Sequence, residues 1–273
     1  MAEQEFQIQF VTAGSLLYSV GHRPWLPPDG QWLLSQSWND LLFAHYAIDP
    51  ATLRRLIPEE LTLELYDGAA WLTLSPFSTS HMRPSGIPPL PGLSFFSQIN
   101  LRTYVTMDGK PGLYYFSVDA ANLTAVWCAR IFFRMQYWHS KIQVSGATIQ
   151  ARKATEPTIH FRASRLHGPA AANGPAKLDV SYAPEGEAER ARRGSLDEFL
   201  TERYCVYSWD RGKFYRIEAH HQPWALQRVS VEFRTNSIAD PLGLALPMKP
   251  DLCHFSRSLK MLAWAPERIH PGR

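Results

Sequence analysis

Residues 98–105 alternate strictly between polar and apolar side chains, which is the pattern of a β-strand with two different faces. One face carries Gln98, Asn100, Arg102 and Tyr104, and the other carries Ile99, Leu101, Thr103 and Val105. Such a strand fits an antiparallel sheet with its polar face in water, or a closed sheet with its polar face inside a pocket. The residue pattern alone favours the solvent-exposed placement.

Composition indicates many short strands rather than long helices. The 273 residues include 21 Pro and 9 Trp, and 45% of them are hydrophobic. Proline interrupts helices, and this length is sufficient for one large β-rich domain. We find no linker-like stretch, so we expect a single domain over residues 1–273.

The charge pattern argues against nucleic acid as a partner. The net charge is only +3, and the one basic cluster, at 190–193, follows three glutamates within six residues, as in a solvated loop. The N-terminus lacks the pattern of a signal peptide, and no apolar run reaches the roughly 18 residues of a membrane span. Three widely spaced cysteines are typical of free thiols. We therefore expect a cytoplasmic protein that does not bind membranes.

Turn and capping signals divide the chain into short elements. Asp67-Gly68 and Asp108-Gly109 predict hairpins, and Asp49-Pro50, Asn122 and Ser195 begin predicted helices. A Pro-rich loop is expected at 78–93. Strands are predicted at 32–48, 61–66, 69–76, 95–106, 113–119, 137–151, 158–164, 177–182, 204–209, 213–219, 225–235 and 253–264. This order suits a β-barrel or cone with a helix plugging one end.

Motifs for cofactors and metals are missing from the sequence. There is no Gly-rich phosphate loop, no G-x-S-x-G and no H-E-x-x-H, so we predict no cofactor and no metal. The pattern H-x-P-W occurs twice, at His22 and at His221. The two histidines could form a pair at one site, but structural anchoring is the favoured interpretation.

Lys141 is the best candidate among the lysines for an imine-forming amine. It follows an aromatic stretch, and such a lysine needs a desolvated or like-charged setting. The favoured alternative is a strand lysine that extends its ammonium group into water.

Seven segments together resemble the YqjF-like bacterial proteins of unknown function. They are His22–Trp25, Asp40–His45, Asp67–Trp71, Asn100–Val105, Phe116–Ala120, Arg203-Tyr204 and His221–Trp224. The matching segments follow one another in the same order as in that family, from about residue 20 to about residue 265. This family is similar to a branch of the acetoacetate-decarboxylase-like superfamily, which implies a closed antiparallel β-barrel or cone with short helices and an interior cavity.

The resemblance reverses the preferred placement of the 98–105 strand, because the corresponding strand of that superfamily helps to line the cavity. It also implies that Arg130 matches the arginine of the decarboxylases' Gly-Arg-Glu motif. Their Pro-Lys-Lys falls on Gln136, Tyr137 and Trp138 in an ungapped count, so the Schiff-base lysine is missing. This chain also has Gln98 where the family has glutamate, and an amide cannot act as a general base.

We therefore expect a barrel that binds a small keto or hydroxy acid without decarboxylase activity. Arg102 and Arg130 would hold the carboxylate, Gln98, Asn100 and Tyr104 would complete the binding face, and Tyr137 and His139 would transfer protons. Two alternatives remain open: a lyase or aldolase that uses Lys141, and a non-catalytic interaction module that uses exposed aromatics and the 78–93 loop. The sequence also leaves the formation of a homo-oligomer open.

Overall fold

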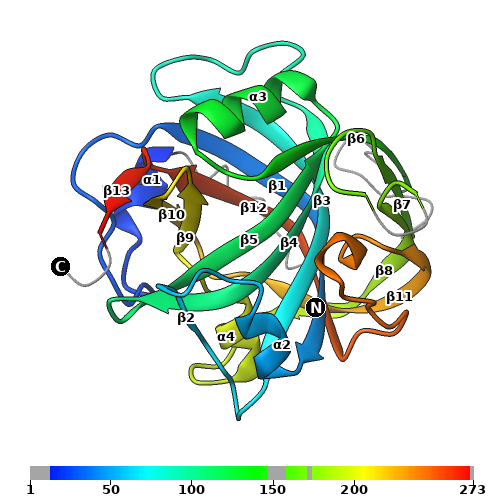
Figure 1. Ribbon diagram of the computed structural model, residues 1–273. Helices are drawn as coiled ribbons and strands as arrows, with labels where there is room; N and C mark the ends of the chain where they lie inside the picture. The colour runs from blue at the N-terminus through cyan, green and yellow to red at the C-terminus, as the bar shows by residue number, and fades with distance from the viewer. Residues whose placement is uncertain (1–12, 147–157, 171–173, 271–273) are drawn as a thin grey trace, which may run out of the picture.

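The chain folds into a mainly β structure whose 13 strands form one continuous sheet (Figure 1). The computed structural model describes residues 13–146, 158–170 and 174–270. The strands are β1 (Leu34–Ile48), β2 (Thr62–Leu63), β3 (Ala70–Pro84), β4 (Phe96–Met107), β5 (Lys110–Ala120), β6 (Tyr137–Ser145), β7 (Ile159–Arg165), β8 (Lys177–Glu189), β9 (Cys205–Asp210), β10 (Lys213–His221), β11 (Leu226–Asn236), β12 (Leu252–Ala263) and β13 (Glu267–Ile269). The helices are α1 (Ala13–Tyr18), α2 (Pro50–Arg54), α3 (Leu123–Phe132), α4 (Leu196–Thr201) and the 3₁₀ turn η1 (Asp240–Leu242). The predicted mainly β fold with short helices is confirmed.

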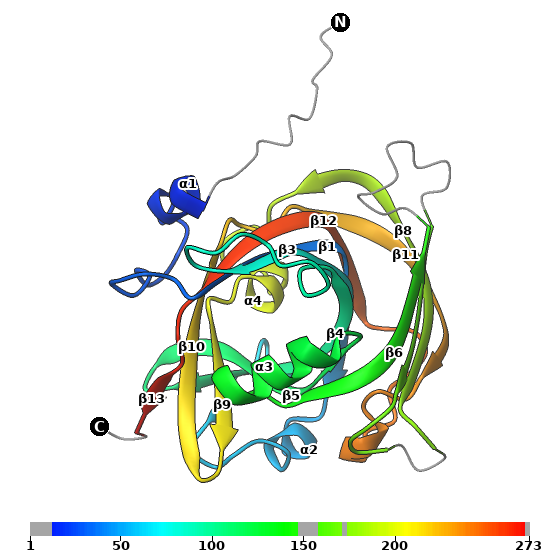
Figure 2. The same cartoon turned by 90° about the horizontal axis from the view of Figure 1, so that it is seen from above.

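The sheet closes on itself in two hydrogen-bonded rings. Strands β12, β1, β3, β4 and β5 follow one another and form a shared wall. On one side, β9 and β10 complete a smaller ring, because β9 pairs with β5 and β10 pairs with β12. On the other side, β6, β7, β8 and β11 complete a larger ring between β5 and β12. Figure 2 shows β9 and β10 on one side of the molecule and β6, β8 and β11 on the other.

Strand β4 separates two different interiors. Its apolar residues Ile99, Leu101 and Val105 pack in the main hydrophobic core, together with Phe161 and Tyr182 of the larger ring. Gln98, Asn100 and Arg102 alternate with them and line the cavity inside the smaller ring. The alternation found in the sequence therefore describes a strand that is buried on both faces, with the polar face inside.

Two strand pairs depart from the expected antiparallel arrangement. Strand β5 pairs in parallel with β6 and with β9, whereas its pairing with β4 is antiparallel. Parallel strands need a crossover connection, and α3 provides it between β5 and β6. The crossover places α3 over one end of the smaller ring.

The two predicted hairpin turns have different outcomes. Asp108 and Gly109, with φ of 51° and 75°, form a tight turn between the paired strands β4 and β5, as predicted. Asp67 and Gly68 also form a tight turn, with φ of 48° and 79°, and the flanking residues Tyr66 and Ala69 pair as predicted. The pairing does not extend along the predicted strands 61–66 and 69–76. The preceding strand, β2, pairs with β4, because β3 leaves the end of β4 unpaired beyond Thr103.

Side-chain caps begin the helices at the residues that the sequence indicated. The Asn122 side chain accepts a hydrogen bond from the amide of Ala125 at the start of α3. The Ser195 hydroxyl accepts one from the amide of Glu198 at the start of α4. In Figure 1, α3 lies at the top of the molecule and α4 at the bottom. No helix in the described ranges is long and apolar enough to cross a membrane.

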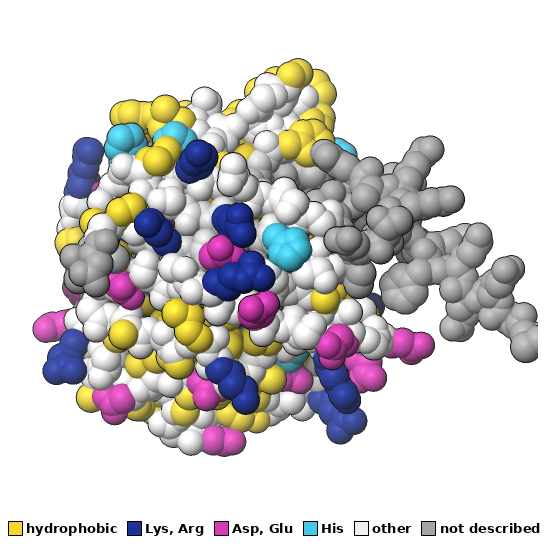
Figure 3. Space-filling model, turned by 90° about the vertical axis from the view of Figure 1, so that its right-hand side faces the viewer, with side chains coloured by type: hydrophobic (Ala, Val, Ile, Leu, Met, Phe, Trp, Pro, Cys, Tyr) yellow, Lys and Arg dark blue, Asp and Glu magenta, His cyan; other side chains and the backbone are white. Residues whose placement is uncertain are grey.

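The flanking regions differ in detail from the prediction. Strand β3 continues to Pro84, so the loop expected at 78–93 spans 85–95. Residues 147–151 of the strand predicted at 137–151 lie outside the described residues. The outer face of the larger ring carries charges of both signs (Figure 3), including the ion pair between Arg162 and Asp179 at 3.1 Å.

The segment before β1 is anchored on strand β10. His22 Nε2 lies 2.8 Å from the carbonyl oxygen of His221. Arg23 donates to His220 Nδ1 at 3.2 Å, and His220 Nε2 donates to the carbonyl of Leu16 at 2.8 Å. The two H-x-P-W segments therefore lie together, and their contacts support the anchoring interpretation.

Candidate ligand-binding cavity

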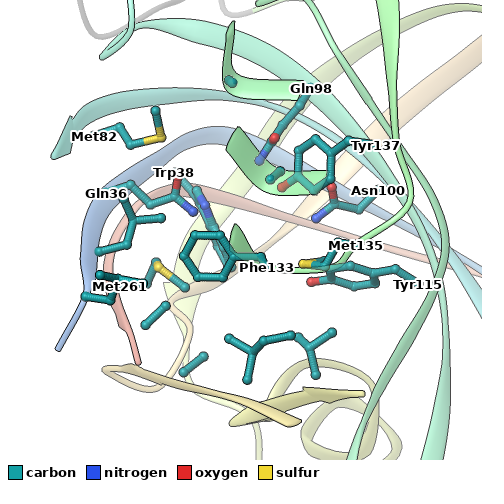
Figure 4. A pocket seen from close by; sticks show the side chains of 18 of the residues that line it. Gln36, Trp38, Met82, Gln98, Asn100, Tyr115, Phe133, Met135, Tyr137 and Met261 are labelled. Carbon is teal, nitrogen blue, oxygen red and sulfur yellow. The ribbon is translucent and has the colours of Figure 1, made fainter. Parts of the chain in front are cut away.

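A cavity of about 360 Å³ occupies the smaller ring beneath α3. Its polar lining residues include Gln98, Asn100, Arg102, Tyr137, Arg203 and His221. Its apolar lining residues include Trp38, Met82, Phe133, Met135 and Met261. In Figure 4, Gln98, Asn100 and Tyr137 lie on one side of the pocket, and Met82 and Met261 face them across it. The cavity therefore has a polar side, built largely by β4, within mostly apolar walls.

Arg102 is the most unusual group of the lining. Only 4% of the residue is exposed, and its guanidinium lies over the ring of Phe43, 5.3 Å from the centroid. Its Nε and Nη2 atoms are buried and have no hydrogen-bond partner among the described residues. No carboxylate of the described residues lies within 4.0 Å of it. A positive charge without a carboxylate partner is therefore buried at the cavity wall, with the Tyr104 hydroxyl as its polar side-chain neighbour.

Arg203 brings a second guanidinium to the same region. Its Nη1 lies 3.1 Å from Glu64 Oε2, and its Nε donates to the carbonyl of Phe199 at 2.9 Å. Burial lowers the pKa of Arg203, the Glu64 carboxylate opposes this shift, and the positive charge of Arg102 adds to it. The two arginines are therefore close enough to repel, and a bound anion would relieve that repulsion.

A chain of buried polar groups lies behind Arg102. The Tyr104 hydroxyl is 2.6 Å from Thr73 Oγ1 and donates to the carbonyl of Leu200 at 2.8 Å. Thr73 Oγ1 is 2.8 Å from His45 Nδ1, and His45 Nε2 is 3.3 Å from His254 Nδ1. Burial raises the pKa of Tyr104, so its hydroxyl stays protonated at neutral pH. These contacts fix the backbone of β4 next to Arg102.

Two further titratable side chains line the cavity. Burial raises the pKa of Tyr137, with a smaller contribution from Tyr115, so Tyr137 can donate a proton in a hydrogen bond at neutral pH. Burial lowers the pKa of His221 to about 4. Both ring nitrogens of His221 lie against backbone carbonyls, those of Gln222 at 2.7 Å and Arg203 at 3.2 Å. His221 therefore holds the wall and presents its ring to the cavity.

The structure brings together some of the residues predicted for the site and not others. Gln98, Asn100, Arg102 and Tyr137 line the cavity. Tyr104 lies behind this lining. Arg130, His139 and Lys141 are absent from the lining.

The course of β6 explains the position of His139 and Lys141. Residues 137, 139 and 141 share a face of this strand. Strand β6 pairs with β5 only at Tyr137–His139 and then follows β7 into the larger ring. Tyr137 therefore faces the cavity, whereas His139 is half-buried beyond it and Lys141 is exposed.

Arg130 is occupied by other contacts. Its Nε donates to the carbonyl of Tyr137 at 2.7 Å, and its guanidinium stacks over the ring of Trp138 at 4.6 Å. Arg203, and not Arg130, is the second arginine of the cavity lining. The only sequence signal for Arg203 was its place in a segment shared with the YqjF-like proteins, because α4 brings it to the cavity through long-range folding.

The lining offers little for a metal or an imine-forming cofactor. Among the described residues that line the cavity there is no lysine, aspartate or glutamate. Over the same described ranges, no three or more His, Cys, Asp or Glu side chains are grouped to hold a metal ion. The three cysteines are free, and Cys128 and Cys205 contribute to the walls.

Sequence comparisons assign the chain to a family. A family model, DUF2071, described as "Uncharacterized conserved protein", matches residues 35–260. The chain is also 38% identical over 237 residues to the "Uncharacterized protein YqjF" of Bacillus subtilis (strain 168), which covers 87% of this chain and 93% of that protein. The chain belongs to the DUF2071 family. The YqjF-like resemblance in the sequence is thereby confirmed.

Solved structures extend the likeness of this DUF2071 protein to acetoacetate-decarboxylase-like folds. The "Enduracididine biosynthesis enzyme MppR complexed with pyruvate" aligns with a TM-score of 0.57 at 12% identity, covering 93% of this chain and 95% of that chain. An "Acetoacetate Decarboxylase-like Enzyme from Sphingomonas wittichii RW1" aligns with a TM-score of 0.57 at 11% identity, covering 89% and 95%. Acetoacetate decarboxylase from Legionella pneumophila aligns with a TM-score of 0.56 at 11% sequence identity, and the alignment covers 94% of each chain. At these identities the likeness establishes the fold alone.

Proposed function

We propose that the cavity binds an organic acid and that Arg102 holds its carboxylate. The observation that carries this proposal is the buried guanidinium of Arg102 at the cavity wall, which has no carboxylate partner and two nitrogens without an acceptor. Burying an ionised group without a partner is strongly unfavourable. A carboxylate ligand would supply the missing charge and accept hydrogen bonds from the planar guanidinium.

The other buried arginines support this reasoning by contrast. Arg165 pairs with Asp119 at 2.7 Å, Arg23 lies 3.6 Å from Glu218, and Arg203 pairs with Glu64. The fold therefore provides a carboxylate for each buried arginine of the described residues except Arg102. That exception lies at the cavity.

Neighbouring side chains have roles that fit an acid with further polar groups. Buried oxygens of Gln98 and Asn100, Oε1 and Oδ1, have no partner among the described residues. These amides would orient a hydroxyl or keto group, and the protonated Tyr137 hydroxyl would donate to it. The complex of MppR with pyruvate shows that one protein with this fold accommodates a keto acid, which supports the ligand class.

We assign binding rather than imine chemistry to this cavity. The exposed position of Lys141, beyond the part of β6 that reaches the cavity, favours this choice. Treatment with pyruvate or acetoacetate and borohydride, followed by mass spectrometry, should leave Lys141 unmodified. A stable adduct on Lys141 would instead support the lyase or aldolase alternative.

The direct test compares acid binding by the wild type and by Arg102→Met. Ligand-detected NMR and calorimetry with a panel of keto, hydroxy and simple carboxylic acids should show at least a tenfold loss for the variant, because a charge-assisted hydrogen bond contributes about 1.5–3 kcal/mol. Arg162→Met removes an exposed positive charge and serves as the control for net charge. Equal binding by wild type and Arg102→Met would refute the role of Arg102.

Arg130→Met tests the arginine that the sequence indicated. Because Arg130 stacks on Trp138 and does not line the cavity, its loss should change acid affinity by less than about fivefold. A loss of acid affinity as large as that of Arg102→Met would show that Arg130 takes part in acid binding.

A further inference from the structure

The two ends of the cavity differ in burial. At the α4 end, the lining residues Thr201, Arg203 and Cys205 are at least nine-tenths buried. At the α3 end, the lining residues Phe132, Leu90 and Leu33 are 62%, 41% and 37% exposed. The cavity is therefore closed near the arginines and open beside α3 and the 85–95 loop.

The two ends also differ in chemistry. Residues at the open end are hydrophobic, and they include Met82, Leu90, Leu93, Phe96 and Phe132. No charged residue of the described chain lines that end. Both cavity arginines lie toward the closed end, because Arg102 is further along β4 than Phe96 and Gln98 and lies close to Arg203 of the α4 end. The cavity thus has a cationic closed end and an apolar open end.

The distance between these ends exceeds the size of a three-carbon acid. Arg102 lies six positions after Phe96, and six steps along an extended strand cover about 20 Å. The volume of about 360 Å³ also falls in the range of roughly 300–1,000 Å³ that is typical of sites for drug-sized ligands. An acid as small as pyruvate would leave the apolar end unfilled.

Hydrophobic side chains are also exposed on the outer surface of α3, the helix that covers the open end. Leu123, Trp127 and Ile131 are spaced four residues apart along one side of α3, and each is about half exposed. Figure 3 shows hydrophobic side chains gathered at the top of the molecule, where α3 lies. The cavity lining of α3 is Ala125, Cys128, Ala129 and Phe132, on the other side of the helix. The exposed residues therefore add apolar surface near the opening and are not part of the cavity wall.

From these observations we infer that the ligand is an elongated monocarboxylic acid with a hydrocarbon body, an aliphatic chain being the simplest form. Its carboxylate lies at Arg102, and its chain extends past Met82 and Met261 toward the open end beside α3. This inference rests on the proposed function and adds the length and the single charge of the acid. A second carboxylate would be buried among apolar residues, so dicarboxylates are excluded.

Calorimetry with four compounds tests the inference: propionate, octanoate, suberate and octanol. Affinity should rise about fourfold for each methylene from propionate to octanoate, because a buried methylene contributes about 0.8 kcal/mol. Suberate has the same length as octanoate with a second charge and should bind at least about tenfold more weakly. Octanol lacks the carboxylate and should also bind at least about tenfold more weakly.

Two variants test separately the contact with the ligand carboxylate and the contacts with its hydrocarbon body. Arg102→Met should weaken octanoate and propionate alike. Met82→Gln keeps a similar side-chain volume and makes the wall polar, so it should weaken octanoate about three- to tenfold and leave propionate unchanged. A circular-dichroism spectrum like that of the wild type shows that each variant is folded.

The outcomes distinguish the two proposals. Binding of propionate or suberate as tight as that of octanoate, or equal losses for octanoate and propionate in Met82→Gln, would overturn the inference and leave Arg102 as the acid-binding group. Octanol binding as tightly as octanoate, or unchanged octanoate binding in Arg102→Met, would overturn the proposed function itself.

Discussion

Arg102→Met should make the ligand-free protein more stable while it removes acid binding. Two buried nitrogen donors of Arg102 lack an acceptor, and each such group costs about 1–3 kcal/mol. Methionine removes both donors and the charge and fills much of the same space. The change also removes the contact with Phe43, which is worth about 0.5–2 kcal/mol.

The balance is a gain of about 1–3 kcal/mol in the free energy of unfolding. For a chain of this length, each kcal/mol corresponds to about 2–4 °C in Tm. Urea unfolding followed by tryptophan fluorescence, without added acid, measures the change directly. Octanoate should raise the Tm of the wild type and not that of the variant, because a ligand stabilises the state that binds it.

Arg165→Met is the matched control for this prediction. Arg165 is buried to the same degree as Arg102, but it donates to both carboxylate oxygens of Asp119. Its removal leaves a buried carboxylate unpaired and should destabilise the protein by about 3–5 kcal/mol. If Arg102→Met destabilises the protein to a similar extent, Arg102 is a structural residue and the reasoning that links it to a ligand is refuted.

Three further changes test other parts of the structure. Burial lowers the pKa of His220 to about 4, below the unfolded value of about 6.5, so the unfolded state binds the proton first as the pH falls. The contribution of neutral His220 to the free energy of unfolding is therefore full above pH 6.5 and falls by about 3 kcal/mol between pH 6.5 and pH 4. Between these pH values, urea unfolding should show a loss of stability that is about 3 kcal/mol smaller for His220→Gln than for the wild type. An equal loss in both proteins would contradict this prediction. Asn122→Ala removes the cap of α3 and a hydrogen bond to the carbonyl of Gly92, so it should cost about 1–2 kcal/mol and speed proteolysis near the 85–95 loop, whereas wild-type stability would show that the cap is dispensable. Gly112→Ala would place a Cβ atom 2.7 Å from Cys205 Sγ, so it should destabilise the β5–β9 contact by about 1–3 kcal/mol, and a Tm equal to that of the wild type would contradict this.

Local signals in the sequence predicted much of the fold. The alternation of β4, the Asp108-Gly109 turn, the caps Asp49 and Ser195 and the helix that follows Asn122 involve residues close in the chain, and the structure confirms each of them. The Asp67-Gly68 turn and the pairing of Tyr66 with Ala69 were also predicted. The longer strand pairing was not found, because β2 pairs with the end of β4 that β3 leaves free.

The composition of the cavity wall was harder to predict from the sequence. Gln98, Asn100 and Arg102 come from one strand, so their shared face follows from the alternation alone. Arg203 reaches the cavity only because β9 pairs with β5 and α4 closes the opposite end. Arg130 is near in sequence to Tyr137, but its side chain turns to a backbone carbonyl and to Trp138. These differences depend on contacts between distant segments, which a single sequence does not reveal.

Neighbouring residues of strand β4 alternate between the cavity lining and the hydrophobic core. Substitution at an even-numbered position from Gln98 to Arg102 changes the cavity lining, whereas Ile99 and Leu101 remain in the hydrophobic core. Ligand preference can therefore diverge among relatives by a few exchanges along a single strand. The scaffold itself need not be rebuilt, since the side chains that drive its folding point the other way.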